Sequence, residues 1–318
     1  MCTPELSIIV AARDAAPFIG QTLESIRGQR FENWECIVVD DGSSDHTAAV
    51  VRHIADKDSR FTLVRQSFGG LSKARNRGFL ESVPASKYVS FMDATDVWEP
   101  NALVSLVESL EQNEGAIGAH GLAELMDREG RPLAPGTFSA FGRQRLGYRN
   151  GAIIEWPACE PTVFETLVWS DPLYPPGLWV ARRTAYESVG LYDPGLQQCE
   201  NWDMALRLSR LGPIHFTDHV VLYHRRCGEA AAGGVWSDLW GVRRLHRKTF
   251  FSRENSPAQR LMLREGWRAW QRFKIREVWG KAVSSCVRGA PLGVMEAGWQ
   301  LPLHAVEYVC GKPSLLGL

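Results

Sequence analysis

Two patterns of apolar and polar positions alternate over the first 115 residues. Continuous apolar runs at residues 6–12, 34–39, 61–64 and 88–92 predict strands that are covered on both faces. Between these runs, apolar residues recur every three or four positions, which predicts helices at about residues 16–29, from residue 45, at 72–80 and up to residue 110. Strands that alternate with helices favour an α/β fold with a parallel sheet and right-handed crossovers.

The pattern changes after residue 115. Residues 117–125 predict an antiparallel strand, and the polar residues 127–132 predict a turn after it. Residues 133–176 are rich in proline, glycine and aromatic side chains, so we expect irregular structure that shapes a second binding surface. A helix is expected over about residues 201–211, and amphipathic helices from residue 236 onward. The chain is therefore expected to have three parts, at residues 1–115, 116–235 and 236–318.

Charge is distributed unevenly along the chain. The 318 residues contain 36 basic and 36 acidic side chains, but residues 239–290 hold thirteen Lys or Arg against three Glu. Such a segment predicts either a surface that lies against an anionic membrane, or a solvated helical bundle packed on the rest of the chain. Nothing else in the sequence resembles a nucleic-acid-binding module, so we expect no nucleic-acid partner.

The cysteines and the apolar runs bear on the location of the protein. The seven cysteines show no CxxC or metal-like spacing, and Cys36 falls in a predicted buried strand, which favours a reducing compartment. The N-terminus has no basic start followed by an apolar run, and no stretch of 18 apolar residues exists. We therefore expect no signal peptide and no membrane-spanning segment, and a cytoplasmic location.

Polar residues follow the predicted strands at the points where these strands end. Asp40 and Asp41 follow the second strand, the segment Gly69–Gly78 follows the third, and Asp93 and Asp96 follow the fourth. In an open parallel sheet, ligands bind beyond the carboxyl ends of the strands, so these residues should face one crevice. The sequence therefore predicts one pocket for a nucleotide-type ligand.

Together with later motifs, these segments resemble glycosyltransferase family 2, the inverting, nucleotide-sugar-dependent group with the GT-A fold. The resemblance covers about residues 5–228 and implies a GT-A-like, mostly parallel sheet with flanking helices, followed by a helical C-terminal appendage. A nicotinamide-binding Rossmann protein is not expected, because no G-x-G-x-x-G follows the first strand. The motifs are LSIIV at 6–10, VDDGSSD at 39–45, GLSKARNRG at 70–78, FMDATD at 91–96, VGLYD at 189–193, ENWD at 200–203 and YHRR at 223–226.

The resemblance implies that residues 1–115 bind a nucleotide-sugar donor, with a UDP-sugar as first choice, and that residues 116–235 bind a saccharide acceptor. Asp40 and Asp41 would accept hydrogen bonds from the base or ribose, although Asp41 could instead cap the turn that follows it. The Arg75 guanidinium suits either the pyrophosphate oxygens or an orienting role toward the acids. The residues expected at the donor are Ala11, Asp40, Asp41, Gly70, Arg75, Asp93, Ala94 and Arg226.

The acidic motif of the family departs from its usual form in this chain. Its Asp-x-Asp pattern binds Mg²⁺ or Mn²⁺ at the diphosphate, but Thr95 stands in the place of the second acid. Arg226 occupies a position where the family often has histidine. Two alternatives follow: Asp96 or His224 completes a metal site with Asp93 and Thr95, or transfer is metal-independent and Arg226, with Arg225, supplies the positive charge.

The catalytic motif departs as well. The family has Glu-Asp, with Asp as the base, whereas this chain has Glu200-Asn201, and an amide cannot accept the proton of the acceptor hydroxyl. Glu200 is the first candidate for the base and Asp203 the second, although Asp203 is also placed for a helical ion pair with Arg207. A catalytically silent, glycosyltransferase-like protein that binds a nucleotide or a partner is the third alternative.

The acceptor side and the basic appendage complete the expectation. The rings of Trp156, Trp169, Tyr174 and Trp179 would suit an acceptor sugar, or else fill a second core. A basic surface would suit an enzyme that extends lipid-linked saccharides in polysaccharide or glycoconjugate synthesis, peripheral to the inner face of the cytoplasmic membrane.

Overall fold

The N-terminal part of the chain forms four parallel strands. The computed structural model describes residues 3–133, 145–196, 198–226 and 239–287, together with His304. The sheet order begins β3-β2-β1-β4, as the alternation of strands and helices predicts. The strands are β1 (Leu6–Ala12), β2 (Trp34–Asp41), β3 (Phe61–Gln66) and β4 (Tyr88–Asp93). The first coincides with its apolar run, and the other three extend one or two residues further, toward the acidic motifs.

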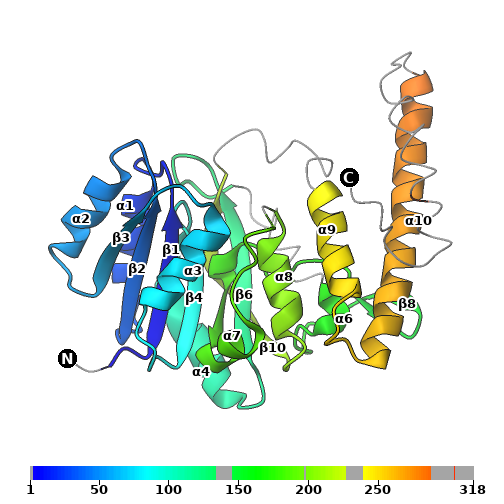
Figure 1. Ribbon diagram of the computed structural model, residues 1–318, viewed down its shortest axis with the longest axis horizontal. Helices are drawn as coiled ribbons and strands as arrows, with labels where there is room; N and C mark the ends of the chain where they lie inside the picture. The colour runs from blue at the N-terminus through cyan, green and yellow to red at the C-terminus, as the bar shows by residue number, and fades with distance from the viewer. Residues whose placement is uncertain (1–2, 134–144, 197, 227–238, 288–303, 305–318) are drawn as a thin grey trace.

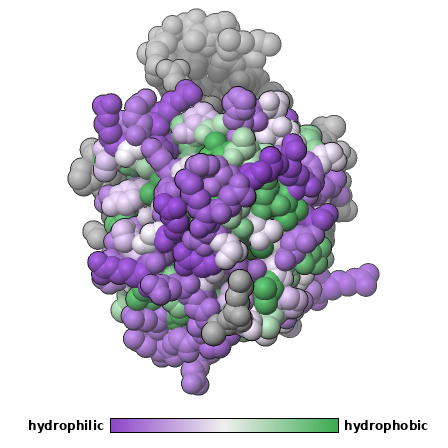
Figure 2. Space-filling model, turned by 90° about the vertical axis from the view of Figure 1, so that its left-hand side faces the viewer, coloured by the Kyte–Doolittle hydropathy of each residue, from purple (hydrophilic) through white to green (hydrophobic). Residues whose placement is uncertain are grey.

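Three helices cover these strands. They are α1 (Ile19–Arg27), α2 (Thr47–Ala55) and α3 (Leu71–Glu81), and every residue of β1 is buried beneath them. Helix α3 lies unusually close to the sheet, because a Cβ atom at Gly78 would stand 2.4 Å from Ile9 of β1. Figure 1 shows α3 in front of the strands, with α2 at the end of the sheet where β3 forms the edge. Figure 2, which views that end, shows a largely hydrophilic surface with small scattered apolar areas.

The second half of the sheet is mixed. Its order continues β4-β9-β6-β10-β5, through β9 (Trp179–Arg182), β6 (Gly118–Met126), β10 (Ile214–Arg225) and β5 (Val97–Trp98). The antiparallel strand predicted at 117–125 is β6, which pairs antiparallel with β9 but parallel with β10. The remaining elements of this part are α4 (Ala102–Gln112), α6 (Phe164–Leu167), the 3₁₀ turn η1 (Pro176–Leu178), α7 (Arg183–Val189) and α8 (Glu200–Leu208).

The segment expected to be irregular contains a hairpin. Strands β7 (Leu146–Arg149) and β8 (Ala152–Glu155) pair antiparallel around Asn150 and Gly151. Both turn residues have positive φ, 51° and 83°, which is the backbone that an Asn-Gly pair adopts in a two-residue hairpin turn. Trp156 and Trp179 are buried in the core, so the core alternative is correct for both. Phe138 and Phe141, which also belong to this aromatic segment, lie outside the described residues.

Two helices form the described part of the C-terminal appendage, α9 (Leu239–Phe250) and α10 (Pro257–Val287). An aromatic cluster attaches them: the ring of His246 lies 5.7 Å from that of Trp202 on α8 and 4.6 Å from that of Trp267 on α10. Burial lowers the pKa of His246 to about 3, so this imidazole is neutral and acts as a packing group. Helix α10 extends well beyond the body of the molecule in Figure 1. Within the described ranges, no helix combines the length and apolar character needed to cross a bilayer.

Candidate active site

Strand register brings the predicted donor residues to one edge of the sheet. Ala12 of β1 pairs with Asp40 of β2, and Ala11 pairs with Asp93 of β4. The three strands therefore end at the same level. A cavity of about 400 Å³ lies beyond this edge, and it brings together Ala11, Asp41, Gly70 and Glu200. The rest of its lining is Ala12, Arg13, Phe68, Gly69, Leu71, Ser72, Pro194 and Leu196.

The two aspartates after β2 have different partners. Asp40 is fully buried, and its carboxylate accepts hydrogen bonds from the Ser43 N–H at 3.0 Å and from Arg65 Nε at 3.2 Å. Asp41 accepts the N–H groups of Gly69 and Gly70, each at 2.8 Å. The turn-capping role considered for Asp41 therefore belongs to Asp40. Asp41 instead fixes the loop after β3, and it also lines the cavity.

A buried guanidinium connects the fourth strand to α8. Arg75 is 1 % exposed and donates hydrogen bonds to Asp93 Oδ1 at 2.8 Å and to Glu200 Oε1 at 2.7 Å. Burial alone would lower the pKa of Arg75, but Asp93, Tyr192 and Glu200 raise it above its ordinary value. Arg75 therefore contacts the acids, as one of the two roles considered for it requires.

Asp96 and His224 form a second pair at the same edge. Asp96 is fully buried, and its Oδ1 atom lies 2.9 Å from His224 Nδ1. The same oxygen accepts a hydrogen bond from the backbone N–H of Arg225 at 3.1 Å. Burial raises the pKa of Asp96, and the Asp96 carboxylate raises the pKa of His224 against the effect of burial. The Tyr174 ring stands edge-on to His224, with centroids 5.5 Å apart.

These acids do not make a carboxylate cage for a divalent cation. Among the described residues, no group of three or more His, Cys, Asp or Glu side chains is arranged to hold a metal. Asp93 is paired with Arg75, Asp96 is enclosed by His224 and Arg225, and Thr95 offers a hydroxyl in place of a carboxylate. The predicted metal ligands lie at the same edge of the sheet. Their side chains are already paired, however, so this donor set does not fit the hard, oxygen-rich site that Mg²⁺ prefers.

The two arginines after His224 differ in their surroundings. The Arg225 guanidinium is buried and donates to the carbonyls of Thr95 and Arg128 and to Gln21. The Arg225 guanidinium is therefore engaged by protein groups. Arg226 is exposed, with its N–H donated to the Met126 carbonyl. Ala94, the last of the expected donor residues, is buried, and its carbonyl accepts a hydrogen bond from the Thr22 hydroxyl.

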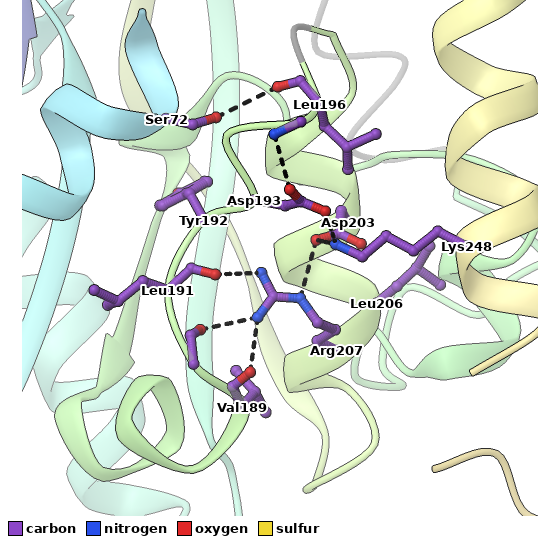
Figure 3. A network of polar contacts seen from close by, with 12 residues as sticks. Ser72, Val189, Leu191, Tyr192, Asp193, Leu196, Asp203, Leu206, Arg207 and Lys248 are labelled. Atoms are coloured by element: carbon purple, nitrogen blue, oxygen red, sulfur yellow. Dashed lines mark hydrogen bonds and ion pairs between the residues drawn. The ribbon is translucent and has the colours of Figure 1, made fainter. Parts of the chain in front are cut away.

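Helix α8 begins with the ENWD motif of residues 200–203. Glu200 is 8 % exposed, lines the cavity and holds Arg75, whereas the Asn201 Oδ1 atom is buried with no hydrogen bond among the described residues. Asp203 lies one turn further and is 2 % exposed. It accepts hydrogen bonds from Arg207 Nε at 2.9 Å and Lys248 Nζ at 2.8 Å (Figure 3), so the ion pair considered for it is present.

Three residues of this region, Arg13, Phe68 and Asp171, were missed from the sequence. Arg13 and Phe68 both line the cavity, with the Arg13 guanidinium 3.8 Å from the centre of the Phe68 ring, which is 63 % exposed. Asp171 has its pKa raised to about 7, first by burial and then by the charge of Glu200. Tyr174, by contrast, is one of the rings predicted for the acceptor side, and it is exposed beside His224. An exposed phenylalanine after a strand was a usable signal, but nothing local in the sequence marks Asp171.

Comparisons with known proteins agree with the resemblance in the motifs. The family model for Glycosyl transferase family 2 matches residues 7–190. An uncharacterized glycosyltransferase of Haemophilus influenzae is 26% identical over 229 residues, which are 69% of this chain and 65% of that protein. The O-antigen biosynthesis protein RfbC of Myxococcus xanthus is 28% identical over 241 residues, 74% of this chain and 17% of RfbC. The chain thus spans less than two thirds of the length of either relative.

Two solved structures share the fold. S. aureus TarS 1-349 in complex with UDP-GlcNAc has a TM-score of 0.59 at 15% identity, over 97% of this chain and 92% of TarS 1-349. The mannosyltransferase PcManGT of Pyrobaculum calidifontis, in complex with GDP-Man and Mn²⁺, has a TM-score of 0.62 at 18% identity, over 97% of this chain and 88% of PcManGT. At these identities the likeness shows the fold alone, which is the GT-A-like arrangement expected from the sequence.

The buried guanidinium allows a prediction about stability. Arg75→Met leaves two carboxylates without their shared partner, and we expect it to lower the free energy of unfolding by about 3 kcal/mol. Arg77→Met, on the exposed side of the same helix, removes only an i,i+4 pair with Glu81 and should cost less than about 0.5 kcal/mol. Urea unfolding measures both. Equal costs for the two variants would show that Arg75 does not hold the acids.

Proposed function

The chain belongs to glycosyltransferase family 2, and on this basis we propose that it transfers a sugar from a nucleotide-sugar donor to a saccharide acceptor with inversion. One observation carries the proposal: the cavity at the sheet edge is bordered by Glu200, which Arg75 joins to the Asp93 carboxylate. The alternative is a catalytically silent protein that binds a nucleotide or a partner, because both the metal motif and the base motif are altered.

The donor would lie in the cavity with its base near Asp41. Asp41 lines the cavity, and the exposed Phe68 ring beside Arg13 offers a flat surface on which a base can stack. Asp40 is enclosed, so we assign it to the support of the loop rather than to direct contact. A UDP-sugar is our first choice, since TarS has been solved with UDP-GlcNAc, and a GDP-sugar is the second, from PcManGT.

Glu200 is our candidate for the catalytic base. In the proposed step, its carboxylate accepts the proton of the acceptor hydroxyl while that oxygen bonds to the anomeric carbon. The bond from this carbon to the phosphate oxygen breaks, and the nucleoside diphosphate leaves with the electron pair. Glu200 borders the cavity, whereas Asp203 forms ion pairs with Arg207 and Lys248, so we assign Asp203 a structural role.

Substitution of the base tests this assignment. With the nucleotide sugar that the wild-type protein turns over, Glu200→Gln should lower kcat by at least about 100-fold, since positioned general bases contribute that much. Asp171→Asn serves as the matched control, because Asp171 is a further carboxylate whose pKa the charge of Glu200 raises. Loss of turnover in Asp171→Asn, with Glu200→Gln active, would move the base to Asp171. An inactive wild type that still binds a nucleotide would support the silent alternative.

We propose further that transfer does not require a divalent cation. The acids at the edge are held by Arg75, His224 and the Arg225 N–H, and Thr95 replaces the carboxylate that would bind the metal. Exposed Arg226, and Arg13 in the cavity lining, are the cations that we assign to the negative charge of the leaving diphosphate.

Removal of metal ions tests the proposal that arginines, rather than a divalent cation, neutralise the leaving diphosphate. Transfer measured in EDTA should keep most of the turnover that is seen with added Mn²⁺, because no carboxylate-bound cation would be lost. Arg226→Gln should lower turnover in both conditions. Abolition of activity by EDTA, with recovery on addition of Mn²⁺, would contradict metal independence and return Asp93 and its neighbours to the metal-site alternative.

The acceptor side and the appendage support a role in polysaccharide or glycoconjugate synthesis. Tyr174, exposed beside His224, is the ring that we assign to an acceptor sugar. The name of RfbC, an O-antigen biosynthesis protein, points to the same class of pathway. The lipid-linked acceptor that we favour would place the protein in the cytoplasm, peripheral to the inner face of the cytoplasmic membrane.

Helix α10 offers a surface for such a membrane. Its arginines recur every four residues, so neighbouring ones differ by only about 40° around the helix axis. Leu261 on this helix is 60 % exposed and Trp279 is 62 % exposed, and both could enter a lipid interface. The arginines are Arg260, Arg264, Arg268, Arg272 and Arg276, and all but Arg268 are exposed.

Vesicle binding tests the membrane surface. The protein should co-sediment with vesicles that contain phosphatidylserine and be released by high salt. Arg260→Gln/Arg264→Gln should weaken binding by about 30-fold, as each cation near an anionic surface contributes about 1 kcal/mol. Arg30→Gln/Arg52→Gln removes the same charge from exposed positions outside the appendage and should bind like the wild type. Absence of binding at low salt would leave the solvated bundle as the correct alternative.

A further inference from the structure

The segment between α7 and α8 forms one wall of the cavity. Pro194 and Leu196 line it, and the segment then leads directly into Glu200. The described residues 190–196, 198 and 199 belong to no helix or strand, and the backbone at Cys199, just before Glu200, is left-handed with a φ of 60°. The position of this wall therefore depends on side chains from neighbouring elements.

Helices α3 and α8 hold the segment from two directions. Asn76 of α3 makes two hydrogen bonds with the Tyr192 backbone, at 2.8 Å to its carbonyl and at 2.9 Å from its N–H. The Ser72 hydroxyl donates to the Leu196 carbonyl at 3.4 Å. From α8, the Arg207 guanidinium donates to three successive carbonyls at 2.9 Å, those of residues 189, 190 and 191.

The C-terminal appendage supplies the third attachment (Figure 3). Lys248 of α9 places its Nζ atom 2.8 Å from Asp193 Oδ2 and 2.8 Å from Asp203 Oδ2, so one ammonium joins the wall segment to α8. Arg244, one turn earlier on α9, donates to the Gly195 carbonyl at 3.1 Å. Gly241, near the start of α9, lies so close that a Cβ atom there would be 2.9 Å from the Cβ of Gln198.

We infer that Lys248 is a positioning residue for the donor site, acting through Asp193 on the wall formed by Pro194 and Leu196. The inference rests on the proposed function, because the cavity must be the donor site. Lys248 supplies the second cation to the buried Asp203, so it is held where it also reaches Asp193. The hydrogen bond from Lys248 is the first cause that lowers the pKa of Asp193, which keeps this carboxylate charged.

This role makes α9 a part of the catalytic unit. The family match ends at residue 190, so Lys248 and the wall segment beyond that residue lie outside it. The expected boundary at residue 236 separates the appendage in sequence, but Lys248, Arg244 and Gly241 join it to the cavity wall. Helix α9 therefore contacts the segment that lines the donor site, although it lies outside the expected donor and acceptor parts of the sequence.

Nucleotide affinity and hydrogen exchange test the inference. Lys248→Met should weaken the binding of UDP or GDP, whichever the wild type binds more tightly, by about 10-fold in calorimetry, because a charged hydrogen bond that orders the wall is lost. In the protein without nucleotide, amide exchange over residues 190–199 should be about 10-fold faster. Lys248→Arg should restore both properties, and Arg247→Met, which removes the adjacent cation of the same helix, should leave both unchanged.

Asp193→Asn is the second variant, because it breaks the contact to the wall and leaves the Lys248–Asp203 pair intact. It should shift affinity and exchange in the same direction even if Lys248→Met does not fold. Folded Lys248→Met and Asp193→Asn proteins that bind nucleotide as the wild type does, with unchanged exchange, would overturn the inference and leave the donor site standing. A wild type that binds neither nucleotide would instead refute the proposed donor site, and this inference with it.

Discussion

A buried guanidinium between two carboxylates holds the two halves of the sheet edge together. Arg75 comes from α3 in the N-terminal half, whereas Glu200 opens α8 in the second half, 125 residues later in the chain. Asp93, at the end of β4, receives the other side of the same guanidinium. Such a group gains little net stability from its ion pairs, since desolvation opposes them, but it fixes geometry strictly, because either carboxylate left alone would be a poorly solvated charge.

This constraint agrees with which acids the altered family motifs retain. The Asp-x-Asp and Glu-Asp motifs have each lost one acid, at Thr95 and Asn201, and each has kept the acid that Arg75 holds, Asp93 and Glu200. The remaining negative charge at the edge is thus largely paired with Arg75 and His224. A sugar diphosphate that enters the cavity would meet compensated acids rather than a repulsive cluster, which is why we favour a donor site that relies on arginines.

Much of the fold could be predicted from short-range patterns. The four parallel strands and their helices follow from apolar periodicity, and the gathering of Ala11, Asp40 and Asp93 follows from the rule that parallel strands end at one edge. The β7–β8 hairpin was not predicted: its Asn-Gly signal lies within a stretch whose proline and aromatic content is typical of irregular structure. Helix α1 is shorter than predicted by three residues at its start and two at its end, and α8 begins one residue before and ends three residues before its predicted bounds, as helix ends are set by capping geometry.

The partners of charged side chains could not be predicted in the same way. Arg225 and Arg226 are adjacent and chemically identical, yet one is buried against carbonyls and the other is exposed. Lys248 meets Asp193 across 55 residues, and no periodicity links two positions so far apart. Asp203 was the exception, because an acid four residues before an arginine on a helix has a local signature that the structure confirms.

The absence of a side chain at Gly78 has a consequence for the chemistry three residues away. Arg75 and Gly78 lie on the buried face of α3, and the missing methyl group lets this helix settle directly onto Ile9. Alanine there would have to displace the Ile9 side chain or lift the helix away from β1, and a lifted helix would carry the guanidinium away from its carboxylates. The position of the Arg75 guanidinium in this site thus depends on Gly78, a residue with no side chain that could contact a ligand. A screen of active-site substitutions limited to polar residues would not include Gly78.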